Sequence, residues 1–264
     1  GGIFCLLIIL FGFVQNENPL LKIGKDQAAN IRIAGPIVAI WFIIFSIPLL
    51  LKIKKNKKIV CYKKVSLFKD VISNLKALFR KSNQGRFLLS RMIYTDGLNT
   101  LFAFGGLYAA GTFKMSFTEI IIFGILINIT AGIGALFFSY LDDRIGPKFI
   151  IKISLISLII FGSTTLIIED KELFLLFGSI LGFFIGSVQS SSRSLMSRYI
   201  SNGNNAETFG LYAISGKFTA FIGPAVLAIT ISIFDSQRAG MGSIIIFLLI
   251  GLILLQRVIE PKLD

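Results

Sequence analysis

Histidine is absent from the 264-residue chain, and only two cysteines are present. Cys5 and Cys61 lie 56 positions apart, a spacing that forms neither a metal-binding cluster nor a disulfide framework. Without histidine the chain has no HExxH zinc motif, and it has no GxSxG nucleophile motif. We therefore predict that the protein is not an enzyme, and we predict no catalytic residue, metal site or cofactor.

Acidic residues are scarce as well, because 14 Asp and Glu stand against 27 Lys and Arg and give a net charge of +13. This charge is compatible with nucleic-acid binding or with a basic membrane protein. Hydrophobic residues make up 54% of the chain, 26 residues are phenylalanine, and the mean hydropathy is +0.80. These values lie outside the soluble globular class, so the positions of the charges decide between the two interpretations.

Long apolar stretches dominate the chain. The run at residues 3–14 is too short to span a bilayer and lacks the charged leader of a signal peptide. We expect it to be the end of a truncated helix in a fragment of a longer, all-α integral membrane protein. Seven further stretches have the roughly 20 residues that a span requires: 31–51, 87–112, 117–141, 149–168, 173–195, 207–234 and 239–258.

Basic residues are distributed unevenly between these spans. If residues 52–86 are cytoplasmic, strict alternation puts 142–152, 193–206 and the tail from Arg257 on the same side, and these regions hold 19 of the 27 Lys and Arg. The opposite side holds 6. Since cytoplasmic loops are enriched in Lys and Arg, the charge is a topology signal and argues against a nucleic-acid partner. We expect a bacterial inner membrane, with the 52–86 loop and the carboxy-terminus in the cytoplasm.

The basic segment 52–86 divides the chain into an amino-terminal part, residues 1–51, and a carboxy-terminal bundle of six spans, residues 87–264. Within this linker, residues 65–81 carry apolar side chains at helical i, i+3, i+4 spacing, with lysine and arginine off that stripe. The pattern predicts an amphipathic helix on the inner membrane surface. A helix recognised by a calmodulin-like partner is the alternative.

Three local patterns predict how the spans begin, pack and bend. Residues 116–119, Ser-Phe-Thr-Glu, form a capping box that opens the 117–141 span. Gly223-Pro224 predicts a kink in the 207–234 span, because proline removes a backbone donor. Small residues that permit close helix approach recur at every fourth position in two stripes: Gly178, Gly182, Gly186 and Ser190, and Gly124, Asn128 and Gly132.

The connector after the 117–141 span is dense in charged residues. Residues 139–148 are Ser-Tyr-Leu-Asp-Asp-Arg-Ile-Gly-Pro-Lys, which resembles the signature loop of the major facilitator superfamily, Gly-x-x-x-Asp-Arg-x-Gly-Arg-Lys. Ser139 replaces the first glycine and Pro147 the first basic residue. The residues that match the signature, and that we predict to act in conformational switching, are Asp143, Arg144, Gly146 and Lys148.

The resemblance implies a fold of two six-helix halves joined by a loop such as 52–86. The chain would hold helices seven to twelve, with helix six and part of helix five, and its partner would be the missing amino-terminal half of the same protein. In the superfamily this aspartate docks near the start of a helix in the opposite half. Pseudo-symmetry then puts Asp143 near Gly1-Gly2, where a helix N-terminus favours a carboxylate. The alternative is that Asp143 and Arg144 are only topology determinants.

A finer resemblance lies in residues 87–125, in Leu-Asp-Asp-Arg-Ile-Gly and in residues 209–224. These stretches resemble the vacuole-effluxer branch, or Unknown Major Facilitator family, whose fungal members belong to the autophagy-related set and export amino acids from the vacuole. The resemblance implies a secondary active transporter of a small polar solute that works by alternating access, with amino-acid efflux as the candidate activity. A non-transporting membrane receptor or scaffold on the same fold is the alternative.

Arg91, Asp96 and Lys217 are charged residues within apolar spans. Arg91 is about four residues from the cytoplasmic end of its span and is expected to reach the interface. Asp96 and Lys217 lie about nine and ten residues in, roughly 14 and 15 Å at 1.5 Å per residue. Because a lone charge at this depth costs at least about 2.5–3.5 kcal/mol, we expect Asp96 and Lys217 to face each other or a shared water-filled cavity. An ion pair that only holds the helices together is the alternative.

Substrate or coupling ions would bind at this pair. A zwitterion placed between the two charges, or a proton on Asp96, would replace the ion pair, and the second route would couple transport to protons. Asn99 and Tyr94 supply neutral hydrogen-bonding groups near Asp96, whereas Asn128 and Gln189 could also bond a neighbouring helix. The complete set of predicted site residues is Asp96, Lys217, Asn99, Tyr94, Arg91, Asn128 and Gln189.

Overall fold

The computed structural model describes residues 2–9, 11–12, 34–52, 83–199 and 205–261. In this part of the chain the regular elements are helices, and no strand occurs. The predicted amphipathic helix at 65–81 lies outside the described residues. The helices are α1 (Gly2–Ile9), α3 (Ala34–Lys52), α5 (Asn83–Phe113), α6 (Phe117–Ile145), α7 (Pro147–Ile167), α8 (Lys171–Arg198), α9 (Asn205–Ser215), α10 (Ile222–Phe234) and α11 (Gln237–Gln256).

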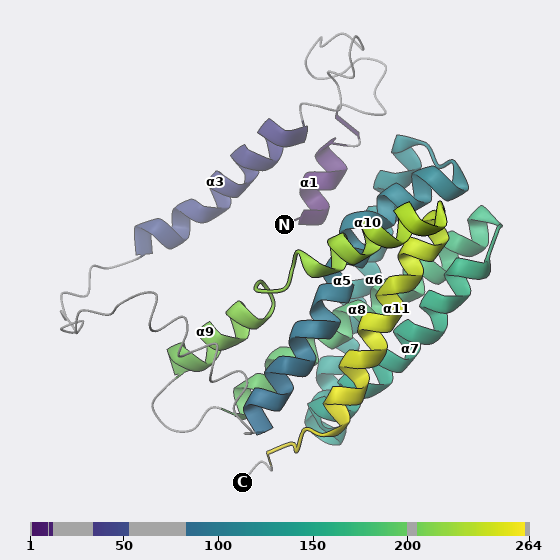
Figure 1. The fold of residues 1–264 in the computed structure, drawn as a ribbon. Helices are drawn as coiled ribbons and strands as arrows, with labels where there is room; N and C mark the ends of the chain where they lie inside the picture. Colours follow the sequence, from purple (N-terminus) through teal and green to yellow (C-terminus); the bar gives the residue numbers. More distant parts are fainter. Residues whose placement is uncertain (1, 10, 13–33, 53–82, 200–204, 262–264) are drawn as a thin grey trace.

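Helices α5, α6, α7, α8 and α11 form a bundle, with the most extensive packing between α6 and α8, α5 and α11, and α7 and α8 (Figure 1). Helices α9 and α10 follow one another along the α5 side of this bundle. Helix α10 packs on α11 and α5, and α9 contacts α5 and α8. Helix α1 contacts α6 and α3. The predicted all-α architecture is therefore confirmed for the described residues.

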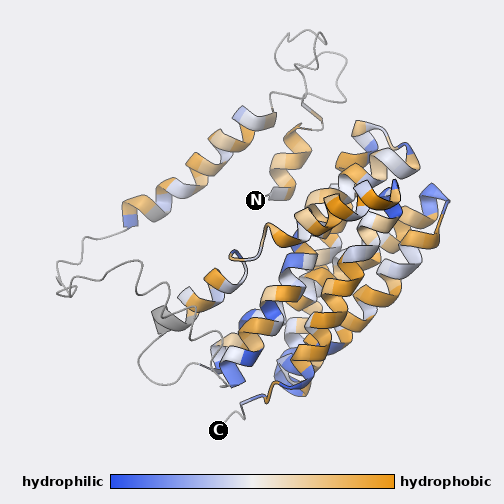
Figure 2. Cartoon of the chain, viewed as in Figure 1, coloured by the Kyte–Doolittle hydropathy of each residue, from blue (hydrophilic) through white to orange (hydrophobic). Residues whose placement is uncertain are grey.

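The bundle has the surface of a membrane protein. Among the described helices, α3, α6, α7, α8 and α11 are long and apolar enough to cross a bilayer. Figure 2 shows apolar residues along the bundle helices and hydrophilic ones concentrated at their ends. Leu136 and Ile167, which are 77% and 78% exposed, would be covered by lipid. Helix α5 spans 31 residues but is more polar, since Arg91, Asp96 and Asn99 lie on it.

The predicted 207–234 span is interrupted in the structure. Helix α9 ends at Ser215 and α10 begins at Ile222, with turns between them (Figure 1). The interruption lies upstream of the expected kink at Gly223-Pro224. Proline within a helix cannot bond the carbonyl four residues earlier and its ring collides with that group, whereas the first helical turn tolerates it. The helix therefore stops before Pro224 and restarts with this proline in its first turn.

Glycines allow α6 and α8 to pack at very short range. A Cβ atom on Gly186 would overlap the Ala131 carbonyl, and one on Gly134 would overlap the Phe183 carbonyl. The predicted close approach of the Gly178–Gly186 stripe is thus confirmed. The second stripe behaves differently, because added Cβ atoms on Gly124 and Gly132 meet no atom within 4 Å.

The predicted capping box at the start of α6 is also confirmed. The Ser116 hydroxyl accepts a hydrogen bond from the Glu119 amide, and a Glu119 carboxylate oxygen accepts one of 2.7 Å from the Ser116 amide. The other carboxylate oxygen forms an ion pair with Lys171 at the start of α8. Glu119 therefore has a structural role that joins two helix ends.

Candidate functional site

A polar cavity of about 260 Å³ lies between α5, α8, α9 and the turn that follows α9. Its lining includes five of the predicted site residues, so residues from three separate spans converge on one space. Val188, Leu98, Thr95 and Ala213 complete much of the wall. The predicted residues that line this cavity are Arg91, Tyr94, Asn99, Gln189 and Lys217.

Positive charge dominates this cavity. Arg91, Arg193 and Lys217 line it, whereas none of its lining residues is acidic. Arg193 and Lys217 are exposed and make no ion pair within the described ranges. Basic side chains grouped in this way attract a carboxylate or another anionic group.

Arg193 was missed as a site residue because the sequence pattern assigned it to a cytoplasmic end. Helix α8 continues to Arg198, so Arg193 lies within the helix, one turn beyond Gln189. Residues four apart share a helix face, and this spacing from Gln189 was a signal that could have identified Arg193.

Arg91 is held in place by the end of α9. Its guanidinium donates hydrogen bonds of 2.7 Å to the Tyr212 carbonyl and to the Ser215 hydroxyl. It also lies 3.5 Å from the centroid of the Tyr212 ring, a cation–π contact. Among the described residues that line the cavity, Arg193 and Lys217 are therefore the cations whose side chains make no hydrogen bond or ion pair.

Neutral hydrogen-bonding groups complete the cavity wall. The hydroxyls of Tyr94 and Ser192 are 2.7 Å apart and form a buried hydrogen bond between α5 and α8. Asn99 and Gln189 are exposed, and the described residues provide no hydrogen-bond partner for their amides. Each amide offers both a donor and an acceptor, so a polar solute in the cavity can bond to either.

Asp96 lies beside this cavity but does not line it. The side chain is buried, and its Oδ2 accepts a hydrogen bond of 2.9 Å from the Gly223 amide at the start of α10. Its Oδ1 has no hydrogen-bond partner among the described residues. The expected pairing with Lys217 is therefore not formed. The interruption after α9 leaves Lys217 on an exposed turn, and the amide of the restarted helix takes the carboxylate instead.

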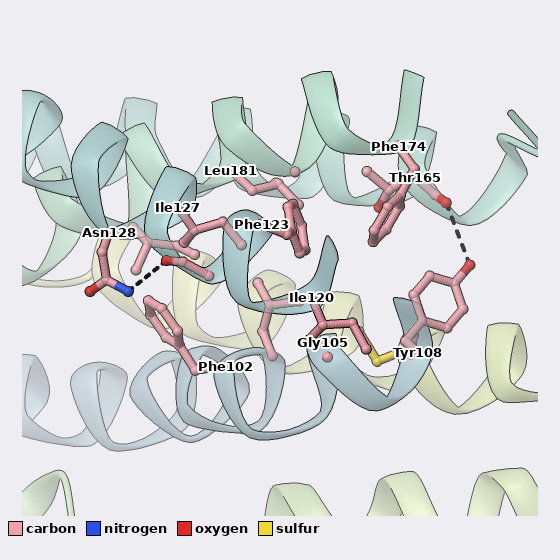
Figure 3. Close-up of a pocket in the computed structure, with 16 residues that line it drawn as sticks. Phe102, Gly105, Tyr108, Ile120, Phe123, Ile127, Asn128, Thr165, Phe174 and Leu181 are labelled. Carbon is pink, nitrogen blue, oxygen red and sulfur yellow. Dashed lines mark hydrogen bonds between the residues drawn. The ribbon is translucent and has the colours of Figure 1, made fainter. Parts of the chain in front are cut away.

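Asn128 lies in a second cavity, of about 230 Å³, between α5, α6 and α8. Figure 3 shows that this space is lined mainly by apolar and aromatic side chains, including Phe102, Phe123 and Phe174. The Asn128 amide donates a hydrogen bond of 2.8 Å to the Gly124 carbonyl of its own helix. The structure therefore separates Asn128 from the other predicted site residues.

The signature residues lie at the junction of α6 and α7. Helix α6 continues to Ile145, so Asp143 and Arg144 belong to its last turn and not to an open loop. Gly146 has φ of 95°, a conformation that glycine adopts without strain. Asp143 is exposed and makes no hydrogen bond or ion pair within the described part. Arg144 lies over the Tyr140 ring and donates a 2.5 Å hydrogen bond to its hydroxyl.

Behind this junction, polar contacts join α6 and α8 to the segment after α11. Arg198 donates to a Glu260 carboxylate oxygen at 2.7 Å and to the Asp142 carbonyl at 3.2 Å. The Tyr199 hydroxyl donates to the Ile259 carbonyl at 2.6 Å, and burial raises the pKa of Tyr199 to about 12. The Lys148 ammonium donates to the Gln256 carbonyl at 3.3 Å. These contacts join the end of α6, the start of α7 and the end of α8 to the end of α11 and the segment that follows it.

Comparison with known proteins supplies the family. Residues 1–262 match the family described as vacuole effluxer Atg22 like. The uncharacterized MFS-type transporter YxiO of Bacillus subtilis (strain 168) is 25% identical over 230 residues, which cover 85% of this chain and 53% of YxiO. Autophagy-related protein 22 of Pichia angusta is 27% identical over 262 residues, which cover 81% of this chain and 45% of that protein.

The chain thus spans about half the length of the curated relatives it matches. Their names agree with the predicted resemblance and with the prediction that the protein is not an enzyme. Together with the helical bundle and its membrane-spanning helices, the matches confirm a partial major facilitator fold. The chain belongs to the vacuole effluxer Atg22-like family.

Proposed function

We propose that the full-length protein is a secondary active transporter and that the polar cavity is its substrate site. The transported solute is small, polar and carries a carboxylate, as an amino acid does. The observation that supports this most directly is that Arg193 and Lys217 are exposed on the wall of a cavity that no acidic residue lines. The names of the relatives support the transporter class.

Each part of the cavity has a role in this proposal. Lys217 and Arg193 bind the carboxylate of the solute through charge-assisted hydrogen bonds. Asn99, Gln189 and the Tyr94 hydroxyl accept hydrogen bonds from its ammonium or other donors. Asp96 does not receive the ammonium directly, because its carboxylate faces the start of α10.

Alternating access requires a second wall, which we assign to the amino-terminal half of the full-length protein. The two halves would rock about the cavity, exposing it first to one side of the membrane and then to the other. Contacts such as Arg198–Glu260 keep the end of this half rigid during that motion. We assign this end, the 52–86 loop and the carboxy-terminus to the cytoplasm of a bacterial cell, because 19 of the 27 basic residues are expected there.

Uptake of a labelled amino-acid mixture into proteoliposomes of the full-length protein tests the proposal. Unlabelled amino acids should compete for uptake, whereas their carboxamide derivatives should not, because the amides lack the carboxylate that Lys217 and Arg193 would bind. Equal competition by acids and amides would overturn the assigned substrate class. Absence of uptake with every amino acid in correctly inserted protein would favour a receptor or scaffold.

A further inference from the structure

The interrupted element α9–α10 is fastened to α5 at both of its broken ends. On α5, Arg91 bonds to the Tyr212 carbonyl and the Ser215 hydroxyl at the end of α9. Five residues further along, Asp96 accepts the hydrogen bond from the Gly223 amide at the start of α10. The turn between the ends is held as well, because the Thr219 hydroxyl donates to the Met92 carbonyl at 3.3 Å.

The two charges match the helix ends that they hold. The last turn of a helix has unpaired carbonyls and partial negative charge, and the first turn has unpaired amides and partial positive charge. Arg91 faces the carbonyl end of α9 and Asp96 faces the amide end of α10. Exchanging the signs would place each charge against a like pole, so the order of these residues along α5 is the favourable one.

Two glycines bring the broken ends close to α5. A Cβ atom on Gly216 would lie 2.9 Å from Arg91 Nη1. A Cβ atom on Gly223 would overlap the Thr100 hydroxyl and lie 3.2 Å from Asp96 Oδ1. Larger residues at these positions would therefore displace the ends from the charges that hold them.

The interruption and the polar cavity coincide. Tyr212, Ala213, Gly216 and Lys217 all line the cavity, so the end of α9 and the turn after it form one of its walls. Backbone without regular helical bonding is tolerated at membrane depth only where protein buries it or where it lines a water-filled space. If the helix were uninterrupted, Lys217 would lie within a regular helix, and no turn would form this wall of the cavity.

We propose that Arg91 and Asp96 are positioning residues that hold the α9–α10 interruption open and thereby keep Lys217 on the cavity wall. They act through their hydrogen bonds to the interrupted element. The value of this arrangement for solute binding rests on the proposed function, whereas the arrangement itself can be tested without transport.

Chemical modification of one introduced cysteine provides the test. In the full-length protein without other reactive cysteines, Ala213→Cys lines the cavity and reacts with small methanethiosulfonates. The rate with an anionic reagent, divided by the rate with a neutral reagent of similar size, reports the positive charge near the sulfur. Lys217→Met should lower this ratio about threefold or more. This decrease is the reference value for a protein in which the Lys217 charge no longer lies on the cavity wall.

Asp96→Leu should lower the same ratio to the level of Lys217→Met, because the start of α10 is released and the turn carrying Lys217 moves away. Direct electrostatics predicts the opposite sign, since removal of a nearby negative charge raises the reaction rate of an anion. Asp96→Asn, which retains an acceptor for the Gly223 amide, should stay near the parent value. An unchanged or raised ratio in Asp96→Leu would overturn the proposal.

Hydrogen exchange of the same variants gives a second, independent readout. The peptide containing Gly223 should exchange about tenfold faster in Asp96→Leu, as expected when a hydrogen bond to a charged group is lost. Ser90→Ala is the matched control, because the Ser90 hydroxyl donates a buried 2.8 Å hydrogen bond from α5 to the Gly251 carbonyl on α11. It should leave both the exchange and the reaction ratio unchanged. If it alters them as strongly as Asp96→Leu, the effect is a general loosening of α5 and the proposal is wrong.

Discussion

The carboxylate of Asp96 accepts a 2.9 Å hydrogen bond from the amide of Gly223, which joins the middle of α5 to the first turn of α10. From their equal depth along the sequence, this carboxylate was expected to face Lys217 or to share a water-filled cavity with it. In the structure a backbone amide is the partner of the Asp96 carboxylate, whereas Lys217 lines the polar cavity. The two charges thus have separate roles.

The first prediction is that Asp96 and Lys217 are energetically independent. In a double-mutant cycle with Asp96→Asn and Lys217→Met, the two changes in unfolding free energy should add within about 0.5 kcal/mol, because the residues share no contact. Unfolding by SDS in mixed micelles measures each value. Stabilisation of the double variant relative to that sum by 1.5 kcal/mol or more would reveal a direct ion pair.

The hydroxyls of Tyr94 and Ser192, in contrast, should be energetically coupled, so that the effects of changing them on the unfolding free energy do not add. Tyr94→Phe and Ser192→Ala each remove one partner of a buried interhelical hydrogen bond. Such bonds contribute about 0.6 kcal/mol on average in membrane proteins and up to about 1.7, so we expect a coupling energy in this range. The same unfolding assay measures it, and additive effects would mean that the bond adds nothing to stability.

Packing of α6 on α8 should be sensitive to one methyl group. Gly186→Ala would force a Cβ against the Ala131 carbonyl, and overpacking of this kind costs about 1–3 kcal/mol. Gly132→Ala is the matched control, because its added Cβ meets no atom within 4 Å and alanine favours helix by up to about 1 kcal/mol. Thermal unfolding in detergent compares the two, and equal effects would contradict the described interface.

Asp143→Asn should leave stability nearly unchanged but slow transport. Asp143 is exposed and makes no hydrogen bond within the described ranges, and such surface changes usually stay within about 0.5 kcal/mol. The expected slowing follows from the resemblance, which gives this carboxylate a role toward the opposite half. Transport equal to that of the parent protein in proteoliposomes would leave Asp143 as a topology residue only.

Sequence patterns predicted the bundle well where one rule governs each element. Apolar runs indicated the helices α6, α7, α8 and α11, the Ser116–Glu119 box marked the start of α6, and the Gly178–Gly186 stripe identified a close helix contact. Each of these features depends on residues near one another in the chain or on one face of one helix. For that reason periodicity was enough to predict them.

The arrangement around α9 and α10 could not be predicted in the same way. Gly223-Pro224 indicated a disturbance, but the position of the interruption depends on Arg91, Thr219 and Asp96 contacts between distant parts of the chain. Depth along the membrane placed Asp96 and Lys217 at one level without determining which way each side chain points. Arg193 was overlooked because its place near a predicted loop had already explained its charge.

Transport by paired lysine variants tests the central claim most directly. Lys217→Met removes a cation from the polar cavity, whereas Lys152→Met removes an exposed cation from α7 that does not line it. We predict that uptake of labelled amino acids into proteoliposomes of the full-length protein falls at least about tenfold in Lys217→Met, which corresponds to ~1.4 kcal/mol of lost interaction, and stays near the parent rate in Lys152→Met. Equal uptake by the two variants would contradict the assignment of the polar cavity as the substrate site.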